Sequence, residues 1–161
     1  MDFYIKLPRN KKEFVLFLTV ISIISVNIIA PLITFFETGF HLATWVRVLK
    51  IIPLIWISVI LLVLLTFKPA EAMTRKILSP NDSFNAHILT NIFCTVFLMS
   101  VFLTVIGTWI GCQKISLDPI TGFFHKWPRN FSISLFVELL IAQPAARLIM
   151  LWMHQRAEIP N

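Results

Sequence analysis

The sequence is poor in charged residues, and this scarcity decides its class. Only 14% of the 161 residues are Asp, Glu, Lys or Arg, whereas 57% are hydrophobic. A soluble domain of this length cannot bury so much apolar surface, because its core is small relative to its surface. The composition therefore excludes an ordinary soluble domain and indicates a protein whose solvent is the lipid bilayer.

Cysteine and glycine are also scarce, with two Cys and four Gly in the chain. Cys94 and Cys112 lie on one predicted helix, about 27 Å apart at 1.5 Å per residue, so they cannot pair with each other. The sequence has no metal-ligand spacing, no HExxH motif and no glycine-rich phosphate loop. We therefore expect no metal, no cofactor and no enzymatic activity.

What the chain does have is long apolar runs. A membrane-spanning helix needs about 20 apolar residues. The runs cover residues 14–36, 51–67, 87–111 and 131–152, and the second reaches full length when it is extended back to Trp45. Residues 69–86 are predicted to be a linker between the second and third runs, because they include the turn-like stretch 79–83.

Basic residues flank these runs and predict their orientation. With the N-terminus in the cytoplasm, nine Lys and Arg residues fall on the inner side and five on the outer side. Inner loops of membrane proteins carry the larger share of Lys and Arg, so we expect a multi-pass protein of the cell membrane with both termini cytoplasmic. The net charge of +6 is attributed to topology and lipid head groups, and no nucleic-acid partner is expected.

The sequence also repeats one pattern, a returning span that opens with Trp-x-Arg. The two copies are Trp45-Val46-Arg47 and Trp127-Pro128-Arg129. The repeat predicts a single domain over residues 1–161 that contains two hairpins, residues 11–78 and 84–154. The expected fold class is all-α, an integral membrane four-helix bundle of two parallel-repeat hairpins related by an axis along the membrane normal.

These markers are predicted to anchor the bundle at the outer interface. Tryptophan prefers that level, with its ring in the apolar boundary and its N–H in water, and Lys and Arg can extend their charge outward from within the span. The predicted interface anchors are Trp45, Arg47, Lys50, Trp127 and Arg129.

The same markers belong to a wider pattern of a Met-Ser element, a helix-ending Gly, a Trp and a closing Pro with basic residues. The matching residues are Met99-Ser100, Gly111, Trp127 and Pro144 to Arg147 in the second half, and Gly39, Trp45 and Lys68-Pro69 in the first. In this pattern the chain resembles the bacterial membrane proteins known only as domain of unknown function 2798. The resemblance implies tandem two-helix hairpins in a membrane and implies no particular activity.

One polar layer is predicted near the middle of the membrane. Glu138 and Trp56 each lie eleven residues past the Trp of their half. This is about 16 Å below the interface, near the middle of a core about 30 Å thick. Asn27 and Ser100, each thirteen residues into its span, fall at the same level. We expect Asn27 to hydrogen-bond to the Glu138 carboxyl.

Glu138 has two interpretations. A charged residue at the bilayer centre costs roughly 2.5–3.5 kcal/mol on insertion scales, and such residues face the bundle interior or a water-filled cavity. The carboxyl either relays a proton or cation, or it joins helices by hydrogen bonds worth about 0.6–2 kcal/mol. The second interpretation is favoured here.

Small residues recur on one face of the third span and predict a helix-packing seam. The seam residues are Ser100, Thr104, Gly107 and Gly111, which include a GxxxG pair. Small side chains let helix backbones approach closely, either within the chain or between two copies. Because four helices make a thin bundle, we also expect a homodimer.

Three functions remain open at this point. The favoured one is an accessory or structural membrane component, with a possible membrane-protein partner. The alternative is a small proton-coupled transporter or channel that uses Glu138 at the midplane. An intramembrane enzyme is the least favoured, because it needs two reactive residues at one depth and only Glu138 is strong.

Overall fold

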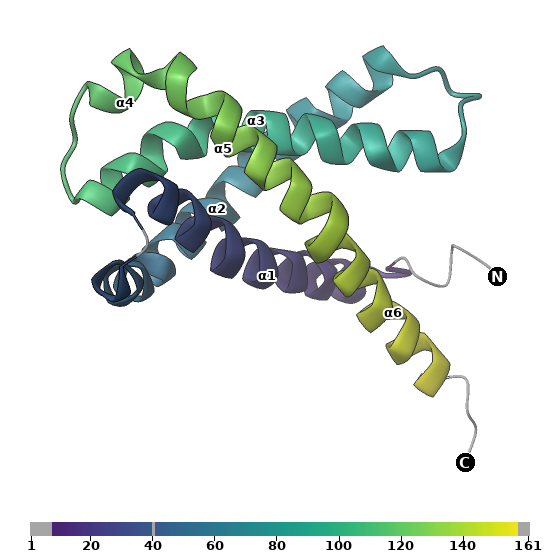
Figure 1. Cartoon of the computed structure of the whole chain (residues 1–161). Coiled ribbons are helices and arrows are strands. Elements are labelled where there is room, and N and C mark those ends of the chain that lie inside the picture. The colour runs from purple at the N-terminus through teal and green to yellow at the C-terminus, as the bar shows by residue number, and fades with distance from the viewer. Residues whose placement is uncertain (1–7, 40, 158–161) are drawn as a thin grey trace.

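The computed structural model describes residues 8–39 and 41–157. Within these ranges the regular elements are helices that follow the apolar runs (Figure 1). They are α1 (Lys11–Thr38), α2 (Leu42–Ile77), α3 (Phe84–Cys112), α4 (Asp118–Thr121), α5 (Phe123–Val137), the π-helix η2 (Glu138–Ala142) and α6 (Gln143–Ala157). The all-α fold class predicted from the sequence is confirmed.

Four stretches within the described residues are helical, long and apolar enough to cross a membrane. They are Lys11–Phe36, Trp45–Ile77, Phe84–Cys112 and Phe123–Arg156. The fourth consists of α5, η2 and α6, which Figure 1 shows as one continuous rod from green to yellow. These stretches match the four predicted spans and fit a multi-pass membrane protein.

The second and fourth spans are longer than predicted. α2 continues through Pro69 to Ile77, so the predicted linker shrinks to residues 78–83. The added turns are held by an ion pair of 2.6 Å between Arg75 and Glu71, one helical turn apart. The prediction was wrong here because it ended the span at the first charged residue, whereas a helix satisfies its own backbone and continues into the polar zone.

The four spans form a ring in which each packs against two neighbours. α1 packs against α2, α2 against α3, α3 against α5, and the fourth span returns to α1. Figure 1 shows the fourth span crossing both α1 and α3. This arrangement leaves the centre of the bundle bordered by all four spans.

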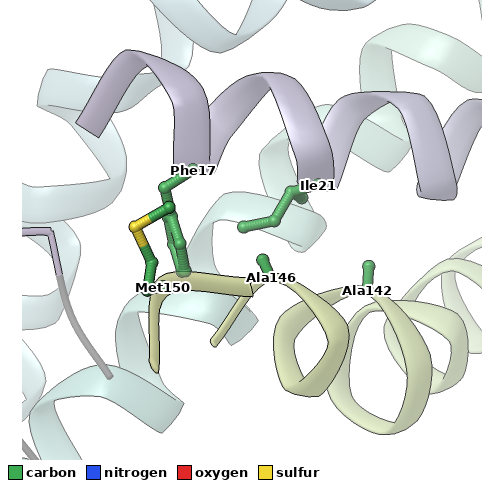
Figure 2. Close-up of a cluster of buried hydrophobic side chains, with 5 residues drawn as sticks. All are labelled: Phe17, Ile21, Ala142, Ala146 and Met150. Atoms are coloured by element: carbon green, nitrogen blue, oxygen red, sulfur yellow. The ribbon is translucent and has the colours of Figure 1, made fainter. Parts of the chain in front are cut away.

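The contact that closes the ring is a small apolar cluster between α1 and the fourth span. Figure 2 shows Phe17 and Ile21 of α1 against Ala142, Ala146 and Met150. Both alanines are fully buried, and their small side chains let the two helices approach closely. At the end of this contact, Glu13 near the start of α1 lies 3.0 Å from Nε2 of the buried His154 on α6.

Candidate functional site: a central cavity with one acid

The ring borders a partly open cavity of about 1220 Å³ that is lined by all four spans. The cavity runs from Arg47 and Lys50, near the start of α2, to Arg75 and His87 at the α2–α3 turn. Most of its wall is apolar, as expected of a membrane bundle, but polar groups occur along its length. The polar residues of its middle part are Ser25, Ser100, Thr104, Asn130, Ser134 and Glu138.

Glu138 is the acid in the middle of this wall. The Ser25 hydroxyl on α1 donates a hydrogen bond of 2.8 Å to its Oε1. Its other oxygen, Oε2, is buried and has no hydrogen-bond partner among the described residues. A buried carboxylate with one neutral partner is poorly compensated, so the site suits either a protonated carboxyl or a cation brought beside it.

The backbone at Glu138 departs from the α-helix. The N–H of Gln143 donates to the carbonyl of Glu138, five residues back, and closes the wide turn η2. Pro144 follows at once, and its ring has no N–H for the preceding turn and crowds the carbonyl four residues back. Proline therefore gives a local reason for the π-turn, and such turns are frequent at functional sites.

The predicted midplane layer is brought together only in part. Ser100 and Glu138 both line the cavity, whereas Asn27 and Trp56 do not. Asn27 is exposed, and its amide donates 2.8 Å to the Ile23 carbonyl of its own helix. The Trp56 indole nitrogen is buried and has no hydrogen-bond partner among the described residues.

The expected Asn27–Glu138 hydrogen bond is therefore replaced by the bond from Ser25. Depth counting placed Asn27 at the right level, but it says nothing about which face of the helix a residue occupies. Ser22 and Ser25 both line the cavity, and they lie three residues apart on one face of α1. That helical spacing of polar residues was the available signal for Ser25.

The Trp127 indole N–H points into the bundle and not into water. Its indole N–H donates 2.9 Å to the Ser100 hydroxyl, and its ring stacks between those of Phe123 and Phe131. A hydrogen bond between α5 and α3 therefore takes the place of the contact with water that was expected for this N–H, and the level of Trp127 in the membrane stays a prediction. Trp45, its counterpart in the first half, is 44% exposed and meets the Phe35 ring edge-on.

The arginine of the second marker also turns toward the bundle. Arg129 is half-buried and donates to the side-chain oxygen of its neighbour Asn130. Asn130 is buried and donates 3.3 Å to the Thr104 hydroxyl on α3. Arg47 and Lys50 in the first half are exposed, as their predicted role as anchors requires.

The predicted packing seam on α3 does not hold within the chain at its two glycines. A Cβ atom placed on Gly107 or Gly111 would meet no heavy atom within 4 Å. Both glycines instead line the cavity, as do Ser100 and Thr104. The spacing that predicted close helix packing therefore widens the cavity along α3, because a missing side chain leaves space on whichever side it faces.

A comparison of the chain with models of protein families, with curated proteins and with solved structures finds no match. The resemblance to the family of unknown function therefore stays a prediction. Across residues 8–39 and 41–157, no group of three His, Cys, Asp or Glu side chains is placed to hold a metal ion. The site is defined by its own geometry: one acid, one serine and a large cavity.

Proposed function

We propose that this protein is a small proton-coupled transporter or channel in which Glu138 is the proton-carrying group. The observation that carries the proposal is the Glu138 carboxyl in the cavity wall, with one oxygen bonded by Ser25 and the other buried without a partner among the described residues. An ionisable residue inside a membrane bundle that borders a cavity is a functional candidate by default.

The alternative role of Glu138 as a structural link is weaker on this geometry. An acid that only joined helices would be expected to use both oxygens, since each unsatisfied buried acceptor costs about 1–3 kcal/mol. Glu138 forms one hydrogen bond to α1, and Gln could form the same bond through its side-chain oxygen. The geometry therefore provides a clean substitution, because Glu138→Gln keeps the link and removes the titrating proton.

The test uses the purified full chain in liposomes that contain a pH-sensitive dye, with a potassium diffusion potential as driving force. We expect proton flux in the wild type and its loss, by at least tenfold, in Glu138→Gln. Glu71→Gln is the matched control: it is the same substitution in the same cavity wall, at a carboxylate already paired with Arg75. We expect the control to keep the wild-type flux.

The outcomes separate the two functions left open by the sequence. Equal flux in wild type and Glu138→Gln, or no flux above empty liposomes from folded protein, would overturn the proton-relay proposal. The accessory or structural component would then be the better hypothesis, with a membrane-protein partner to be sought. Unfolding temperatures in detergent would show whether both variants are intact.

The membrane location, the orientation and the oligomeric state are proposed as well. We propose that it resides in the cell membrane with both termini cytoplasmic, on the bias of Lys and Arg toward that side. We also propose a homodimer of two-hairpin repeats. The apolar residues exposed on α2, which include Leu61, Leu64 and Leu65, are available to lipid or to a second copy.

A further inference from the structure

We propose that the central cavity binds an amphiphile with an anionic head group and an apolar chain, the head group lying at Arg47 and Lys50. This names the solute of the proposed transport. It depends on that proposal for movement across the membrane and not for binding. Three features of the cavity select this ligand: the charge of its wall, its size and the open space along α3.

The charge of the wall selects the sign of the head group. Besides His87, the charged residues of the wall are four cations and two acids, namely Arg47, Lys50, Arg75, Arg147, Glu71 and Glu138. Glu71 is paired with Arg75 at 2.6 Å. The remaining wall has an excess of positive charge, which attracts an anion and opposes a cation.

The two ends of the cavity differ in how their cations are used. Arg75 is engaged by Glu71 at the α2–α3 turn. At the opposite end, Arg47 and Lys50 are exposed and form no ion pair or hydrogen bond with another described residue. They lie three residues apart on α2, so both charges are available on one face to the same head group. The anionic group is therefore placed at this end.

The size and the apolar lining of the cavity favour a long apolar ligand over a compact one. Its volume of about 1220 Å³ is above the roughly 300–1,000 Å³ of ordinary small-molecule pockets. Apolar side chains of two spans border it between the cationic end and Glu138, including Val26, Ile29, Ile51 and Ile55. An acyl chain would make apolar contacts with these side chains. A polar solute would instead place polar groups against them without hydrogen-bond partners.

The third wall of the cavity provides the space. Gly111 lies in the last turn of α3, and Gly107 lies one turn earlier. Both border the cavity, and added Cβ atoms would meet nothing within 4 Å. Side chains placed there would enter the cavity without displacing the backbone, so the cavity can be filled without unfolding the bundle.

An anionic amphiphile also fits the acid at the middle of the cavity. The excess cations would compensate the head group, and the neutral carboxyl would add no repulsion. A cationic amphiphile would instead have to pass Arg47 and Lys50 before reaching Glu138.

The test is a binding measurement on the full chain in nanodiscs of zwitterionic phosphatidylcholine. The probe is palmitate with a photoreactive diazirine at the chain end, and its crosslinks are mapped by mass spectrometry. We expect crosslinks on cavity-lining residues of α1, α2 and α3. Excess palmitate should compete, and hexadecanol and dodecyltrimethylammonium should compete at least tenfold more weakly.

Two sets of variants locate the head group and the chain. The double variant Arg47→Gln/Lys50→Gln should weaken palmitate binding by about tenfold, since two charged contacts are lost. Its matched control is Lys68→Gln/Lys76→Gln, which removes the same charge from exposed residues of α2 outside the cavity. Gly107→Leu should reduce crosslinking at least tenfold, whereas Leu89→Phe, an enlargement on the exposed side of α3, should leave it unchanged.

The outcomes are distinct. Stronger competition by dodecyltrimethylammonium than by palmitate would overturn the assigned charge, and crosslinks confined to residues outside the cavity would overturn the site. Competition by phosphatidylglycerol in place of palmitate would support the proposal with a membrane lipid as the source of the ligand. Binding that persists in Glu138→Gln, when proton flux is lost, would separate the ligand site from the proposed proton step.

Discussion

The second and fourth spans begin with the same Trp-x-Arg marker and then differ at their middle. α2 remains one helix of 36 residues through two prolines, Pro53 and Pro69. The fourth span is divided by a π-turn at Glu138, which lies as far past its Trp as Trp56 lies past its own. Glu138 borders the cavity, whereas Trp56 does not.

This difference shows that two spans with the same sequence marker need not share the same chemistry. Both spans supply a wall of the same ring, but the midplane acid and the irregular backbone belong to one of them. The tryptophans differ in the same way: Trp127 is bonded into the bundle, and Trp45 is 44% exposed. Substitutions that give one span a feature of the other, or remove that feature from both, therefore test this difference directly.

The largest effect is expected when an acid is placed in the second span. Trp56→Glu would put a carboxyl where the wild-type indole nitrogen already lacks a partner among the described residues and where the central cavity does not reach. The cost is roughly 2.5–3.5 kcal/mol for the charge, on top of lost packing. Thermal unfolding in detergent should show a strongly destabilised protein, and Trp56→Phe is the control. Equal stability of the two variants would mean that the halves are interchangeable.

A smaller effect is expected for the tryptophans of the two markers. Trp127→Phe removes the hydrogen bond to Ser100 and should lower the free energy of unfolding by about 1 kcal/mol. Trp45→Phe removes no hydrogen bond to another described residue and keeps an aromatic ring beside Phe35, so it should cost only a few tenths of a kcal/mol. Chemical unfolding of both variants measures the difference, and equal losses would contradict the inward role of Trp127.

The smallest change is expected for the prolines. Pro144→Ala restores an N–H and removes the ring that crowds the preceding turn, so amide hydrogen exchange near residues 138–143 should slow as the turn becomes more regular. Pro53→Ala should change exchange much less, because α2 is already α-helical around Pro53. Unchanged exchange in Pro144→Ala would mean that packing rather than proline causes the π-turn.

The fold was largely predictable because each span satisfies its own backbone, so length and apolarity suffice to find it. The span ends were not, since Pro69 and the charged residues beyond it look like a linker and yet continue α2. Counting residues predicted which positions along the helices belong to the site, but it did not predict which face of each helix they occupy. Glu138 and Ser100 were found by counting residues from the span ends, but the same count selected Asn27, which faces away from the cavity.

Ser25 was missed for the same reason, since its only signal in the sequence was its spacing of three residues from Ser22, which places both on one face of α1. The glycines of α3 show a further limit. GxxxG spacing records where side chains are absent, and the same absence serves a tight contact or an open space. Only the position of the neighbouring helix distinguishes the two.

The ring of four spans also has a mechanical consequence. Its helices are joined edge to edge, and among the described residues neither α1 with α3 nor α2 with α5 forms a substantial contact across the centre. In such a four-sided frame each helix keeps its contacts with its two neighbours, but no contact across the centre opposes tilting of the helices against one another. Small tilts at the four interfaces could therefore narrow one end of the frame while they widen the other, and no helix would have to break.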